Sequence, residues 1–147
     1  MDRSLLNKLT SEVRRYHNKD FLKATMAVCA LSAGADNDAG LSERFGIDHV
    51  MASVPALRVF DVDKAGQILD GYFTALREDD KNAKKILSNK VRRMGGNHKR
   101  ARTLMRVAFL IIVADENIHF KERLEFARLC LLLGLEPGRV WSELEAT

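Results

Sequence analysis

The chain has little of what marks a secreted, membrane-spanning or disulfide-stabilised protein. Only two of its 147 residues are cysteine and only two are proline. Cys29 and Cys130 lie in apolar stretches and belong to no Cys-x-x-Cys pair, so we expect both to be small buried side chains. The longest apolar run, 107–114, is far shorter than the roughly 20 residues that cross a bilayer. The first residues contain no apolar signal segment, and we therefore expect a cytoplasmic protein.

The sequence also lacks the short motifs on which many enzyme classes depend. It contains no phosphate-binding glycine loop, no dinucleotide-binding glycine pattern, no Gly-x-Ser-x-Gly and no His-Glu-x-x-His. Its four histidines, at positions 17, 49, 98 and 119, show no short spacing of the kind that metal ligands have. We therefore expect that the protein is not an enzyme.

What remains is an ordinary globular composition with apolar residues at helical spacing. Hydrophobic residues make up 46% and charged residues 30% of the chain, which suits a folded domain and not a disordered chain. The spacing predicts helices over about 5–16, 20–35, 80–94, 98–114 and 120–133. Ser42 is expected to begin a helix that Pro55 ends, Asp61 to cap the next, and Pro137 to open a short last one.

These elements predict an all-α fold, a single compact bundle of seven to eight helices over residues 1–147. The run 107–113 taken alone also suits a buried strand, because periodicity does not separate the two there. Leu104 and Met105 precede it at helical spacing and favour a helix. No linker or low-complexity tract divides the chain, so we expect one domain.

An internal repeat is the most informative feature of the sequence. Two segments share one template without gaps: Val, six residues, Ala-Asp, six residues, Glu-Arg. The first runs from Val28 to Arg44 and the second from Val107 to Arg123. In each, an apolar helix ends at Ala-Asp, a short polar loop follows, and a new helix begins near the Glu. The repeat predicts two pseudo-symmetric helix-loop-helix halves.

The acidic residues of the two loops are candidate ligands for a divalent metal ion. Carboxylates held close together repel one another unless a proton or a cation lies between them. Oxygen ligands of this kind favour Ca²⁺, Mg²⁺ or Mn²⁺ over Zn²⁺. An EF-hand is excluded, because the position that needs its bidentate Glu is Ile47. The predicted metal-binding residues are Asp36, Asp38, Glu43, Asp115 and Glu122.

The same acids have a purely structural interpretation. Glu43 and Glu122 stand in the first turn of predicted helices, where a carboxylate is favoured by the helix dipole and completes a capping box. Asp36 and Asp115 can accept hydrogen bonds from loop amides. The sequence leaves metal binding and capping open.

A basic segment, residues 81–106, offers a second candidate surface. It holds ten cationic side chains and no acidic one. Such a segment attracts nucleic acid or an anionic membrane surface, and it also suits the solvated face of two helices around a turn. It contains no aromatic residue on which a nucleobase would stack. The cations are Lys81, Lys84, Lys85, Lys90, Arg92, Arg93, Lys99, Arg100, Arg102 and Arg106.

Three groups of residues together resemble the TerB family of tellurite-resistance proteins. The first is Tyr16-His17-Asn18-Lys19-Asp20-Phe21 followed by Ala27-Val28-Cys29-Ala30-Leu31 and Ala35-Asp36. The second is Leu57-Arg58-Val59-Phe60-Asp61, and the third is 107–115 followed by Glu122 and Leu132-Leu133-Gly134-Leu135-Glu136-Pro137. The resemblance extends over nearly the whole chain, although each motif is short.

The resemblance implies a non-enzymatic accessory or scaffold protein of tellurite resistance and stress response. It also implies a divalent metal ion held by the two loops, at Asp36, Glu43, Asp115 and Glu122. The implied partners are other tellurite-resistance or stress proteins, including membrane-associated ones at the inner membrane. By the same resemblance, family members usually carry Gly after each loop Asp, and many carry Glu-Glu at the second acidic position. This chain has Asn37 and Glu116, and then Arg44 and Arg123, which are expected to weaken metal binding.

Overall fold

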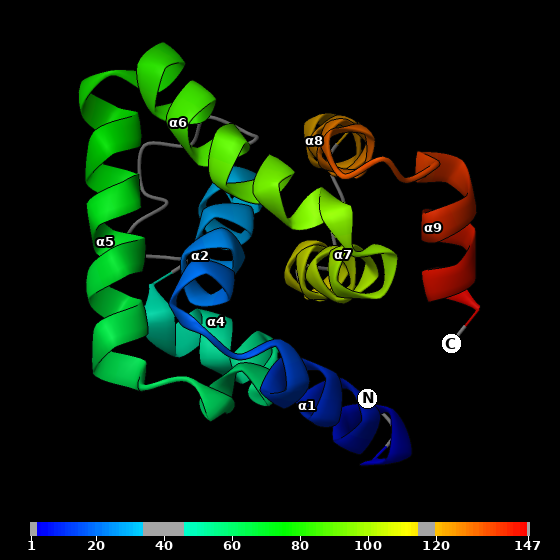
Figure 1. The fold of residues 1–147 in the computed structure, drawn as a ribbon. Coiled ribbons are helices and arrows are strands. Elements are labelled where there is room, and N and C mark those ends of the chain that lie inside the picture. Colours follow the sequence, from blue (N-terminus) through cyan, green and yellow to red (C-terminus); the bar gives the residue numbers. More distant parts are fainter. Residues whose placement is uncertain (1–2, 34–45, 115–119, 147) are drawn as a thin grey trace.

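The computed structural model describes residues 3–33, 46–114 and 120–146, and this part of the chain is helical throughout (Figure 1). It contains eight α-helices, two short 3-10 helices and no strand, which confirms the predicted all-α fold. In chain order the elements are α1 (Arg3–Tyr16), α2 (Lys19–Ala33), α4 (Ile47–Ser53), η2 (Pro55–Val59), α5 (Val62–Glu78), α6 (Asp80–Arg92), η3 (Arg93–Gly96), α7 (His98–Val113), α8 (Phe120–Leu132) and α9 (Pro137–Glu145).

Helix α2 lies at the centre of the bundle. Every residue from Phe21 to Ala33 except Lys23 is buried, because this stretch is almost entirely apolar or small. It packs against α5, α6, α7 and α8 (Figure 1). A helix that is apolar on all sides needs partners on all sides, and the other helices supply them.

Side chains at the helix ends explain where the elements begin and stop. Asp61 caps α5 by accepting a hydrogen bond from the Lys64 amide at 3.1 Å, as predicted. Gly134, with φ of 76°, follows α8 in the left-handed conformation that suits glycine. The Leu135 amide then donates to the Cys130 carbonyl at 2.9 Å, which completes a Schellman motif.

Ser42, the predicted start of the third helix, lies outside the described residues. The helix that the structure describes before Pro55, α4, begins at Ile47 after its N-cap Gly46 and ends at Ser53. Pro55 itself opens the 3-10 helix η2, which the sequence analysis did not anticipate. Proline suits this first position because its missing N–H would have had no partner there.

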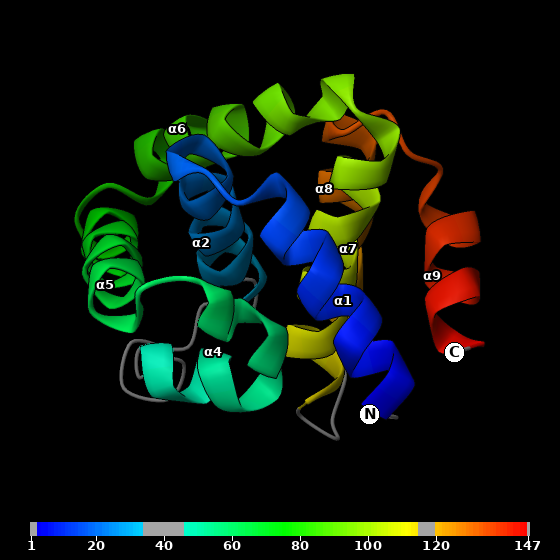
Figure 2. The same ribbon diagram turned by 60° about the horizontal axis from the view of Figure 1, so that its bottom comes forward.

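The two helices that precede the predicted acidic loops run side by side. Helices α2 and α7 pack on each other, and both descend in the same direction in Figure 2. Their last helical residues, Ala33 and Val113, therefore lie towards the same end of the bundle. None of the helices in the described ranges is both long and apolar enough to cross a membrane.

Candidate functional site

Glu122 is the predicted metal ligand that the structure describes. It lies in the first turn of α8, is only 9% exposed and interacts with other groups of the protein, as buried glutamates do. The positive end of the helix dipole stabilises a carboxylate at this position. Helix α8 packs on both α2 and α7, the helices that lead into the two predicted loops. Glu122 thus belongs to a helix that contacts both halves of the repeat.

The other four predicted ligands, Asp36, Asp38, Glu43 and Asp115, lie outside the described residues. Within 3–33, 46–114 and 120–146, no three His, Cys, Asp or Glu side chains form a group able to hold a metal ion. A metal site that includes Glu122 would therefore need its remaining ligands from the two loops. Ala114, the C-cap of α7, is the last described residue before Asp115, and α7 ends towards the same end of the bundle as α2.

Arg123, the basic residue that follows Glu122, is held on another face of α8. Its guanidinium carbon lies 4.4 Å from the centre of the Trp141 ring on α9. Trp141 is buried and meets Phe109 and Phe126 edge-on, each with ring centres 5.0 Å apart. This contact directs the guanidinium towards α9.

The two thiols are poor candidates for chemistry, as the sequence predicts. Both Cys29 and Cys130 are buried and free. Burial raises the pKa of the Cys29 thiol to about 12, and burial with a smaller contribution from Glu136 raises the pKa of Cys130 to about 12. A thiol with such a pKa is protonated at neutral pH and is neither a nucleophile nor a ready metal ligand.

The basic segment does not form one continuous surface. Figure 1 shows α6 lying across the view and α7 nearly end-on, so the two helices run in different directions. Three cations of α6 lie in a groove beside α8, and three of α7 lie in a groove beside α1: Lys84, Lys85 and Arg92 in the first, and Lys99, Arg102 and Arg106 in the second. Each set lines its own groove, which we call the α6–α8 groove and the α1–α7 groove.

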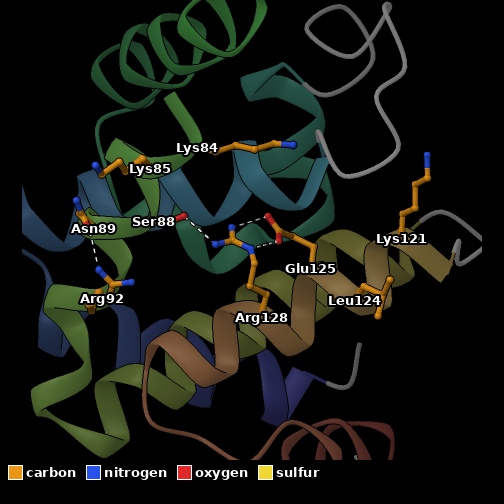
Figure 3. A pocket seen from close by; sticks show the side chains of 9 residues that line it. All are labelled: Lys84, Lys85, Ser88, Asn89, Arg92, Lys121, Leu124, Glu125 and Arg128. Carbon is orange, nitrogen blue, oxygen red and sulfur yellow. Dashed lines mark hydrogen bonds and ion pairs between the residues drawn. The ribbon is translucent and has the colours of Figure 1, made fainter. Parts of the chain in front are cut away.

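The α6–α8 groove has a volume of about 660 Å³ and is strongly positive. Five cations and one carboxylate line it, a net charge of +4 that equals the formal net charge of the whole chain. Arg128 holds the two helices together: it donates to Glu125 at 2.8 Å and to Ser88 on α6 at 2.9 Å (Figure 3). The lining residues are Lys84, Lys85, Ser88, Asn89, Arg92, Lys121, Leu124, Glu125 and Arg128.

The α1–α7 groove is smaller, about 420 Å³, and is also lined by five cations and one carboxylate. Arg106 forms an ion pair with Glu12 at 2.8 Å, and Arg102 forms one with Glu143 on α9. Glu12 also accepts a hydrogen bond from Thr103 at 3.2 Å. These two ion pairs join α1 and α9 to α7.

Sequence reasoning missed the contribution of α8 to the basic surface. Lys121 and Arg128 lie outside 81–106, and only the packing of α8 on α6 brings them beside that segment. The sequence did contain a sign that a second face of α8 is unusual. Phe120, Leu124 and Leu131 recur at helical spacing as core residues do, but all three side chains are exposed in the structure.

Comparison with known proteins agrees with the fold. The family model described as tellurite resistance protein TerB matches residues 22–142, which is most of the chain. Neither the search of curated proteins nor that of solved structures found a match. The matched range extends from α2 to α9 and includes both copies of the internal repeat. The chain therefore belongs to the tellurite resistance protein TerB family.

Proposed function

We propose that the protein is a non-enzymatic accessory or scaffold protein of tellurite resistance and stress response that binds a divalent metal ion. Its metal site would combine Asp36, Asp38, Glu43, Asp115 and Glu122. Ca²⁺, Mg²⁺ and Mn²⁺ fit an all-carboxylate site better than Zn²⁺ does. Metal binding would change how the protein interacts with other tellurite-resistance or stress proteins, including membrane-associated ones. The protein itself would not catalyse a reaction.

The observation that carries this proposal is the burial of Glu122 at the start of α8. A carboxylate kept from water is costly unless its charge is compensated. The helix dipole and contacts of Glu122 within the protein compensate that charge in part, and a divalent ion shared with the loop carboxylates would add to them. The shared direction of α2 and α7 supports the view that the two acidic loops supply the other ligands.

The test is a thermal melt of the purified protein in EDTA and in millimolar Ca²⁺, Mn²⁺ or Mg²⁺. An ion present at about 100 times its Kd stabilises a protein by about 2.7 kcal/mol, which raises the Tm of a domain of this size by about 5–10 °C. Glu122→Gln keeps the shape of the side chain but removes its charge, so it should abolish most of this rise. Asp36→Asn combined with Asp115→Asn should do the same.

Glu78→Gln, at an exposed position on α5, is the matched control and should melt like the wild type with and without metal. Mass spectrometry of the native protein would identify the bound ion and its stoichiometry. A wild-type Tm that does not respond to any of the three ions would refute the proposal. So would an undiminished response in Glu122→Gln.

A second candidate function is an adaptor that binds an anionic partner through the basic segment. The net charge of +4 in the α6–α8 groove favours it. The sequence suggests nucleic acid or the inner-membrane surface as the partner. Binding of either would weaken steeply with added salt, because it depends on exposed charges.

A further inference from the structure

Helix α8 presents an apolar stripe to solvent. Of the five large hydrophobic side chains exposed in the described residues, three lie on this helix: Phe120 at 75%, Leu124 at 53% and Leu131 at 67%. Their spacings of four and seven residues place them on one face. The opposite face, with Phe126, Leu129 and Cys130, is buried in the core. Helix α8 thus has two apolar faces, one buried in the core and one exposed to solvent.

The apolar stripe borders the α6–α8 groove. Leu124 belongs to both, and Figure 3 shows it beside Lys121 on the same helix. Two of the groove cations are already paired, Arg128 with Glu125 and Lys84 with Asp80 at 3.1 Å. Among the described residues, Lys85, Arg92 and Lys121 form no ion pair, and Arg92 has only the neutral side chain of Asn89 as a partner, at 2.7 Å.

We propose that this surface binds an acidic amphipathic helix of a partner protein. The apolar face of that helix would pack on Phe120, Leu124 and Leu131, and its acidic edge would enter the groove. Its carboxylates would there meet Lys85, Arg92 and Lys121, which form no ion pair with an acidic residue of 3–33, 46–114 or 120–146. This is the familiar recognition of an amphipathic helix by apolar anchors, with a charged rim that selects the partner. The inference rests on the adaptor role proposed above and names its partner as a polypeptide.

The geometry favours a polypeptide over a bilayer or a nucleic acid. The unpaired cations line a concave groove between crossing helices, which a flat membrane surface would not enter (Figure 3). No aromatic side chain lines the groove, so nucleobases would find no stacking platform there. Phosphates would also leave the apolar stripe without a partner, whereas a leucine-containing helix covers it.

The probe is a synthetic, fluorescein-labelled helical peptide of about 14 residues, which matches the length of α8 at 1.5 Å per residue. Leucines occupy one face and glutamates the rest. A second peptide has the same composition in an order that spreads the leucines around the helix. Binding to the full chain is measured by fluorescence anisotropy in EDTA, so that the result does not depend on the metal site.

We expect the amphipathic peptide to bind, and to bind more weakly as salt is raised. Lys85→Glu with Arg92→Glu should weaken binding about tenfold or more, and so should Leu124→Gln with Leu131→Gln. Lys8→Glu with Arg15→Glu makes the same charge change at exposed positions of the α1–α7 groove and should leave the affinity within about twofold. Circular dichroism melts of each variant confirm that it is folded.

Equal binding of the two peptides, or equal loss in the α1–α7 control, would show mere charge attraction and overturn the inference. Parallel assays use single-stranded DNA and vesicles of phosphatidylglycerol and phosphatidylethanolamine. Binding to either of these without binding to the peptide would keep the adaptor role but overturn the polypeptide partner. If neither peptide, DNA nor vesicle binds at low salt, both the inference and the adaptor role fail.

Discussion

The contact between Arg123 and Trp141 leads to a prediction whose size can be worked out. Arg123 is exposed, whereas the indole ring 4.4 Å below its guanidinium is 6% exposed. A cation over an aromatic ring at such a site contributes about 0.5–1 kcal/mol. For a domain of about 150 residues, each kcal/mol shifts the Tm by about 2–4 °C. Arg123→Gln should therefore lower the Tm by about 1–4 °C.

The assay is a calorimetric melt in EDTA, with Arg58→Gln as a control that makes the same charge change at an exposed position of η2. A double-mutant cycle with Trp141→Leu isolates the contact: Arg123→Gln should have almost no effect once the ring is absent. If Arg123→Gln destabilises no more than Arg58→Gln, or equally in both backgrounds, the cation–ring contact does not stabilise the fold.

The same variant tests how Arg123 affects the proposed metal site. Because the guanidinium is directed towards α9, we expect Arg123→Gln to leave the metal-induced rise in Tm unchanged. A larger rise in the variant would mean that the guanidinium repels the ion, as the sequence comparison with the family suggests.

Two further predictions concern the thiols and the glycines. Cys29 and Cys130 should react with iodoacetamide at pH 8 only after unfolding in guanidinium, and labelling of the native protein would contradict their raised pKa of about 12. Because the folded state favours the protonated thiols, their contribution to stability is complete below pH 9 and is lost as the pH rises towards 12. Thermal melts at a series of pH values can follow this loss. Gly134→Ala should destabilise the protein by about 1 kcal/mol, because Gly134 has a φ of 76° that alanine adopts poorly. Gly71→Ala should stabilise it by about 0.5–1 kcal/mol, because Gly71 lies within α5 with open space around it. Chemical denaturation measures both changes in the free energy of unfolding. Equal effects of the two substitutions would refute the backbone argument.

The helices were predictable because their signals are local. The predicted range 98–114 corresponds to α7, which ends at Val113, and 120–133 corresponds to α8, which ends at Leu132. Capping residues such as Asp61 and the glycine at 134 act through neighbours a few positions away. Where the prediction fell short, at η2, a proline that was expected only to end a helix also began another.

The candidate sites were predictable only in part, because they depend on which helices meet. The repeat identified Glu122 from its position in a template, and the structure shows that this carboxylate is buried. The basic segment reads as one uninterrupted run of cations, but η3 separates α6 from α7 and the two helices face different neighbours. Sequence distance does not show that Arg128 and Ser88, forty residues apart, share a hydrogen bond.

The sequence by itself determined the helical class, most helix boundaries, the burial of the two cysteines and the likeness to the TerB family, since each depends on local composition, spacing or motif. Only the tertiary structure decided that α2 is the central helix, that Arg123 packs on Trp141, and that α8 joins α6 in a positive groove beside an open apolar stripe. These features arise from the packing of helices distant in sequence. That packing is set by how all the apolar faces are buried together, and no single segment specifies it.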